Sequence, residues 1–407
     1  MPHGGKMKRA VAREGKGVAY SRTNRAGRLA CIFLLLSIVG GGHPAGAQSR
    51  TVRYYGYFDT VYGFNRFASD TLSWDAFHLD LIGSWLLDEH FRLVAETAFE
   101  HGPQHTEELT GDIEIRGFIE IMLNEALRIN VGKFLLPFGD QNLYHDATPA
   151  YYSVEPPRSV YWKRRIGFDA AGNAVEDRYF EKYGVGIWAA GSFFPGDEWE
   201  IDYDLYTTNG RGSGNIFKED DNRSPGLGAK LLLYTPHGFK IGGSWYRDVH
   251  GMVVGVTQPS EGERTAPAPD GSEQGGSFTS NNIAGQIGWD HGPFHFRGEV
   301  LGSFGVFSAQ DSPDTSFDAL GWYVEGVYTL FERISPYFRF EEFHADFEDQ
   351  RERIVRGGIH YAFPNSSVFL KVEHAQYLIR EPPIPSPIEP GNDVPDFETM
   401  AQIAVAF

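Results

Sequence analysis

The feature that most constrains this chain is a strict two-residue alternation that recurs along most of its length. Between Ile113 and Leu123 every second residue is isoleucine, leucine or glycine, and Glu114, Arg116 and Glu120 occupy positions between them. Such alternation over about 10 residues is typical of a β-strand with one apolar and one polar face. Similar segments recur from about residue 53 to the end of the chain, which predicts an all-β protein.

The connections between these segments alternate between short and long. Tight turns such as 88–90 and 124–126 follow every second strand, whereas longer polar stretches such as 209–224 and 250–280 follow the others. We count about sixteen strands, and this rhythm is typical of a transmembrane antiparallel β-barrel with short periplasmic turns and longer outer loops. A barrel of that size would enclose an aqueous channel rather than a packed interior.

The N-terminal region has the order of a secretory signal peptide. Residues 1–28 are rich in lysine and arginine, an apolar run Leu29–Val39 follows, and Ala45–Ala47 supplies small residues for cleavage. The apolar run is shorter than the roughly 20 residues that a transmembrane helix needs. The sequence therefore predicts an exported protein with a signal peptide at 1–47 and a barrel at 48–407.

Beyond that region no apolar stretch reaches the length of a membrane-spanning helix. A closed barrel is then the structure that could cross a membrane, because each of its backbone groups is paired within the protein. The last strand places Thr399, Ala401, Ile403, Val405 and Phe407 on one face. A final strand that ends on an aromatic residue resembles the assembly signal of Gram-negative outer-membrane barrels. We therefore expect the cell outer membrane as location, with its lipid and lipopolysaccharide as partners.

Composition and motifs argue against several classes of function. The formal net charge is −18, and loss of the basic leader makes the mature chain more acidic, which argues against a nucleic-acid partner. Cys31 is the only cysteine and lies within the predicted signal peptide. His101 and His105 flank Gly102 and Pro103, so they are loop residues rather than paired metal ligands. No nucleophile-elbow or phosphate-loop motif occurs. We predict no cofactor, no metal site and no enzymatic activity.

The longest break in the alternation lies near 140–181. It follows a strand at 127–134 and a bend at 135–139, and alternation resumes near Lys182. A long loop inside a dense strand pattern usually carries function. We predict that this third outer loop folds into the barrel mouth and narrows it. Its charged residues are the predicted constriction and solute-binding residues, namely Asp140, Asp146, Glu155, Arg158, Lys163, Arg164 and Arg165. A basic surface patch that contacts lipopolysaccharide phosphates is the alternative for the last three.

The polar faces of the strands should line the channel if the apolar faces meet lipid. The predicted lining residues are Arg92, Glu96, Glu114, Arg116, Glu120, Arg297, Glu299, Arg339, Glu341 and Arg356. They could sort ions by charge. The alternative is that they form cross-strand ion pairs that stiffen the wall.

The bend carries a resemblance to a known family. The run Val131-Gly-Lys-Phe-Leu-Leu-Pro-Phe-Gly139 is similar to a strand end of the phosphate-selective (O/P-type) porins in the broad sense. That resemblance implies a sixteen-stranded barrel, usually trimeric, with an inward-folded third outer loop. Phosphate selectivity in that family rests on ladders of basic residues. Here the basic residues stand among many carboxylates, so phosphate specificity is not implied.

Three functions are compatible with these patterns. The first is a porin whose water-filled channel passes small hydrophilic solutes or ions, anions included, by diffusion. The second is a structural barrel that acts as a sheath around a periplasmic partner protein. The third is an outer-membrane barrel enzyme, for which the sequence offers no motif. We take the porin as the prediction.

Overall fold

The computed structural model places the predicted barrel region. It describes residues 52–64, 72–100, 112–144, 151–161, 164–168, 174–196, 198–210, 224–251, 276–309, 315–346, 349–381 and 395–407. The predicted signal peptide at 1–47 lies outside the described residues.

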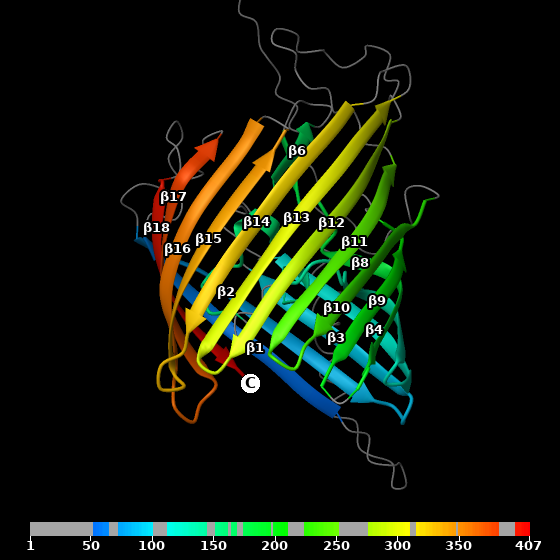
Figure 1. The fold of residues 1–407 in the computed structure, drawn as a ribbon, viewed down its shortest axis with the longest axis horizontal. Coiled ribbons are helices and arrows are strands. Elements are labelled where there is room, and N and C mark those ends of the chain that lie inside the picture. The colour runs from blue at the N-terminus through cyan, green and yellow to red at the C-terminus, as the bar shows by residue number, and fades with distance from the viewer. Residues whose placement is uncertain are drawn as a thin grey trace, which may run out of the picture. The chain divides into compact units, whose positions relative to one another are not determined.

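Sixteen strands form a closed antiparallel barrel, which confirms the predicted fold class (Figure 1). Each strand pairs with the next barrel strand along the chain, β5 pairs with β8, and β1 pairs with β18 to close the ring. The barrel strands are β1 (Val52–Phe64), β2 (Leu72–Leu86), β3 (Phe91–Glu100), β4 (Asp112–Asn124), β5 (Leu127–Leu135), β8 (Tyr183–Phe193), β9 (Glu200–Thr208), β10 (Gly226–Tyr234), β11 (Phe239–Gly251), β12 (Gly276–His291), β13 (Phe294–Ala309), β14 (Thr315–Tyr328), β15 (Ile334–Ala345), β16 (Gln350–Ala362), β17 (Val368–Glu381) and β18 (Phe397–Ala406).

The exposure of the side chains is inverted relative to a soluble protein. On β18, for example, Gln402 is 2% exposed whereas the neighbouring Ile403 is 48% exposed. The same alternation gives the other strands an apolar outer face, and charged side chains are buried on the inner face. Large exposed apolar residues on the outer face include Ile115, Ile119, Leu231, Ile283, Ile287 and Val372. An apolar outer face is what a lipid-embedded barrel requires.

The last residue completes the closure between β1 and β18. The Phe407 N–H donates to the Gly56 carbonyl oxygen, and the Gly56 N–H donates to the Phe407 carbonyl oxygen, both at 2.9 Å. The Phe407 ring occupies the space that a side chain at position 56 would take. The terminal aromatic residue is therefore packed on the first strand.

The segment between β5 and β8 contains short regular elements that the alternation did not predict. These are α2 (Gln141–Tyr144), α3 (Arg158–Tyr161), β6 (Arg164–Phe168) and β7 (Ala174–Asp177), and β6 pairs with β7 in a separate two-stranded sheet. Helices of four residues are too short to show a 3.6-residue period. Within the described ranges, no helix is both long and apolar enough to cross a membrane.

Candidate functional site

The bend after β5 turns the chain from the wall into the barrel. Gly139 adopts a positive φ of 63°, which glycine tolerates without a steric penalty. Its carbonyl oxygen accepts a hydrogen bond from Lys230 Nζ at 2.6 Å, and its N–H donates to Ser244 Oγ at 2.8 Å. Both partners lie on the inner face of β10 and β11. The bend is therefore fixed by side chains of β10 and β11, and we call the following segment, as far as Lys182, the inward loop.

An apolar contact holds one side of the inward loop against the wall. Phe138 is fully buried, and its ring lies 4.8 Å from that of Phe180 and 6.4 Å from that of Tyr246 on β11. The apolar anchor is the set of buried residues Phe134, Leu136, Phe138, Val160, Tyr161, Phe180, Tyr206, Tyr246, Ala284, Leu301 and Tyr323. Its wall members lie on the inner face of β5, of β9 and of β11 to β14. These inner-face residues pack against the inward loop, whereas the alternation alone predicted that they would contact water.

A charged contact holds the other side of the loop against β14 to β17. The Arg339 guanidinium is fully buried and donates to Ser153 Oγ at 2.8 Å and to the Glu155 carbonyl oxygen at 2.9 Å. Arg339 also donates to Glu341 Oε1 at 2.9 Å and to Glu325 Oε2 at 3.3 Å. The predicted lining residue Arg339 thus binds the loop instead of facing open water.

Arg356 completes this contact one strand further on. Its fully buried guanidinium donates to Glu155 Oε2 at 3.2 Å, to Glu341 Oε1 at 3.1 Å and to Glu373 Oε1 at 2.6 Å. Lys371 Nζ donates to the Ser153 carbonyl oxygen at 2.9 Å. We call Glu155, Glu325, Arg339, Glu341, Arg356 and Glu373 the charged cluster. Buried charges persist when they are paired in this way.

The helix α3 adds a third ion pair to the same wall. Arg158 lies 3.9 Å from Glu155 and 3.9 Å from Glu352. Burial opposes its charge, but the fields of Tyr377, Glu352 and Glu155 raise the pKa of Arg158 above its ordinary value. Arg158 therefore stays a cation.

Asp140 is tied to β11 and to β13, which adjoins β14 of the charged cluster, and Arg297 lies on the same strand as Glu299. The Asp140 carboxylate accepts from Lys240 Nζ at 2.6 Å, and its N–H donates to Glu299 Oε1 at 2.9 Å. Arg297 Nε donates to Glu325 Oε1 at 2.6 Å. Both of these predicted lining residues are thus engaged in pairs near the loop.

The inner face of β3 and β4 remains more accessible, and we call it the open wall. Arg92 pairs with Glu120 at 2.5 Å, and Arg116 pairs with Glu96. The side chains of Arg92 and Arg116 are 38% and 19% exposed, whereas those of Arg339 and Arg356 are 0% exposed. Glu114, which accepts from Lys182 Nζ at 2.8 Å, is 28% exposed. Arg92 is thus the most exposed of these arginines, whereas Arg116 is about as exposed as Arg297, whose side chain is 21% exposed.

The structure brings together some of the predicted constriction residues and not others. Glu155 and Arg158 form an ion pair at 3.9 Å, whereas Asp140 pairs with Lys240 in a separate contact. Arg164 and Arg165 lie on β6, paired in register with Asp177 and Glu176 of β7. Asp146 and Lys163 fall outside the described residues.

Sequence reasoning did not identify several residues that hold the loop. These are wall residues that contact the loop or pair with the arginines that bind it, namely Tyr206, Tyr246, Lys230, Lys240, Leu301, Tyr323, Glu325 and Glu398. All lie on the inner face of their strands, which is the face that the alternation indicates for them. Bulky tyrosines in a face that otherwise reads as polar are the signal that could have suggested a packed contact.

Comparison with known proteins agrees with the barrel fold. No protein-family model and no curated protein matches the chain. Solved outer-membrane barrels do match in structure at low sequence identity. The channel DcaP of Acinetobacter baumannii is 11% identical, with a TM-score of 0.54 over 90% of this chain and 100% of that one. An anion-selective porin from Comamonas acidovorans is 11% identical, with a TM-score of 0.53 over 88% of this chain and 100% of that one.

A third match is OmpT, an outer membrane protein of Vibrio cholerae solved in a trimer form. It is 13% identical, with a TM-score of 0.51 over 88% of this chain and 100% of that one. This chain therefore has the fold of outer-membrane porins. At these identities the likeness concerns the fold alone.

Proposed function

We propose that this protein is an outer-membrane porin whose channel passes small hydrophilic solutes or ions by diffusion along the open wall. The observation that carries the proposal is the asymmetry of the interior. The inward loop covers Arg339 and Arg356 completely but leaves Arg92 and Arg116 partly exposed. A loop fixed to one side of a sixteen-stranded barrel narrows the channel and keeps a passage on the other side.

The charge preference of this passage is set by the residues that remain exposed along it. Field lines from Arg92 and Arg116 favour anions, and Glu114 opposes them. Asp140, Glu155 and Arg158 serve in this proposal as anchors of the constriction, because each is engaged with the wall. Lys163, Arg164 and Arg165 remain the proposed basic edge of the passage.

The cellular context of the proposal follows from the sequence. We propose that residues 1–47 direct export and that 48–407 insert in the Gram-negative outer membrane, where lipid and lipopolysaccharide cover the apolar outer face. We also propose a homotrimer, which the trimer form of the Vibrio cholerae protein supports by analogy.

The test is single-channel conductance in a planar lipid bilayer with a salt gradient. Wild type should give steady conductance, and the joint change of Lys163, Arg164 and Arg165 to Gln should lower the anion preference in the reversal potential. Steady conductance with an unchanged reversal potential in the variant would support the porin but would reject the basic edge. Folded protein without conductance rejects the porin and favours a sheath around a periplasmic partner protein.

A further inference from the structure

A groove of about 500 Å³ lies on the outer face of the barrel, across β13, β14 and β15. Its two walls are the exposed rings of Phe296 on β13 and Phe338 on β15. Gly326 of β14 lies between them and is paired in register with both. A Cβ at Gly326 would enter open space. The groove therefore exists because the residue between two phenylalanines is glycine.

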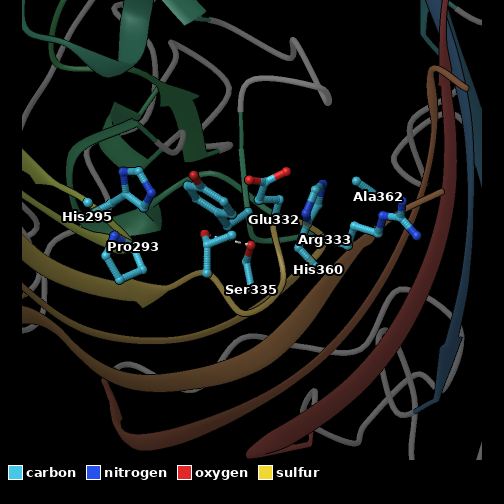
Figure 2. Close-up of a pocket in the computed structure, with 10 residues that line it drawn as sticks. Pro293, His295, Glu332, Arg333, Ser335, His360 and Ala362 are labelled. Carbon is cyan, nitrogen blue, oxygen red and sulfur yellow. Dashed lines mark hydrogen bonds between the residues drawn. The ribbon is translucent and has the colours of Figure 1, made fainter. Parts of the chain in front are cut away.

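The interior face of the same strands is polar and differs from the groove. A cavity on that side is lined by His295, Ser335 and His360 among others (Figure 2). Polar groups there are already engaged, since His295 pairs with Asp290 at 2.6 Å and Ser335 Oγ lies 3.0 Å from Thr329 Oγ1. The outer groove is lined mainly by aromatic rings, so it suits an apolar ligand.

The aromatic residues at one end of the groove indicate its depth in a membrane. Tyr328 is the last residue of β14 before a short turn, and its ring lies 4.6 Å from that of Phe294. Trp289 Nε1 donates to the carbonyl oxygen of His237, in the turn between β10 and β11, at 3.2 Å. Tyrosine and tryptophan of membrane barrels lie at the level of the lipid headgroups. The groove therefore starts at the headgroup level on the turn side and extends along β14 into the apolar band.

A lipid acyl chain fits this groove better than a second barrel does. Lipid tails are as apolar as the side chains of this face, so binding here depends on close packing rather than on removal from water. A chain between two rings has contacts on both sides, whereas a chain on a flat face has them on one side. A flexible chain can follow the space between Phe296 and Phe338, whereas the wall of a second copy is a rigid sheet.

We propose that the groove binds one acyl chain of a glycerophospholipid from the leaflet on the turn side, with the chain over Gly326 and the glycerol near Tyr328. The inference rests on the proposed insertion in the outer membrane, where the short turns face the periplasm. It makes this part of the outer face a fixed lipid site, whereas lipid elsewhere on the face exchanges freely.

The test is native mass spectrometry of the folded barrel in detergent micelles, titrated with palmitoyl-oleoyl phosphatidylethanolamine. Wild type should retain one phospholipid per chain. Gly326→Phe fills the groove and should lower the retained fraction at least fivefold. Gly285→Phe is the matched control, because Gly285 faces outward on β12 opposite Val300 and does not line the groove. That change should leave lipid retention as in wild type.

Two further measurements separate the chain contact from other effects. Phe338→Ala removes one wall without adding bulk and should also lower retention. Glycerophosphoethanolamine, which has the headgroup but no acyl chains, should not displace the bound phospholipid. Heat-modifiable migration on a gel checks that each variant is folded.

Three outcomes overturn the proposal. The first is folded wild type that retains no phospholipid, and the second is equal retention in Gly326→Phe and Gly285→Phe. The third is a Gly326→Phe protein that keeps its lipid but loses the mass of an oligomer, because the groove would then hold a second copy. Lipid retention is measured without conductance, so a barrel that retains the lipid but passes no ions rejects the channel alone.

Discussion

At the scale of single residues, the most consequential group is the buried Arg356 guanidinium. We expect Arg356→Met to destabilise the folded barrel by about 3–5 kcal/mol, because Glu155, Glu341 and Glu373 would be left without this partner in the interior. Urea unfolding in micelles, followed by tryptophan fluorescence, measures this change.

The control for Arg356 lies on the same strand. Arg353 pairs with Glu342 at 2.8 Å, and both side chains are more than a third exposed, so Arg353→Met should cost about 1 kcal/mol or less. Equal losses in the two variants would show that burial does not decide the strength of these pairs.

The sequence predicted the orientation of charged residues better than their partners. Alternation predicts that Arg92, Glu120 and Arg356 lie on the inner face, and Glu120 and Arg356 are buried in the structure. Arg92 and Glu120 lie opposite each other on the neighbouring strands β3 and β4, so they pair within the local sheet. Glu155 and Arg356 are 201 residues apart, and no local pattern connects them. That pairing depends on where the loop packs, which is a tertiary property.

At the scale of elements, β14 and the inward loop meet at Gly321. A Cβ at that position would overlap the Ser159 carbonyl oxygen of α3. We therefore expect Gly321→Val to push α3 from the wall and to raise single-channel conductance. Gly326 lies on the same strand with open space around its Cβ position, so Gly326→Val should leave conductance unchanged. A rise in neither variant would show that α3 does not narrow the channel.

The strands and the loop differ in how well the sequence predicted them. The sixteen barrel strands follow from local alternation, and the alternation that resumes near Lys182 is observed as β8, Tyr183–Phe193. The helices α2 and α3 and the pair β6 and β7 did not follow, because each is only four or five residues long. Isolated elements of that length are not stable alone and form through contacts with the rest of the protein.

At the scale of the whole molecule, Phe407 extends the pairing between β1 and β18 that closes the barrel. Deletion of Phe407 removes two backbone hydrogen bonds to Gly56, which at roughly 0.5–1.5 kcal/mol each predicts a loss of about 1–3 kcal/mol. Phe407→Ala keeps both bonds and removes only the ring, so it separates the two contributions. Urea unfolding of the three proteins side by side measures them, and a deletion that unfolds like wild type contradicts this view of closure.

The passage itself is a property of the whole barrel, since the wall and the loop define it together. If solutes move along the open wall, the joint change of Arg92 and Arg116 to Gln should shift the reversal potential toward cations, because Glu96, Glu114 and Glu120 would then face the passage with fewer cations beside them. Arg353→Gln removes a positive charge from an exposed pair outside the open wall and should leave the reversal potential unchanged. The measurement is the reversal potential in a planar bilayer at low and high salt, and screening should reduce the shift at high salt. An equal shift in both proteins would reflect total charge, and the absence of a shift would mean that ions take another route past the loop.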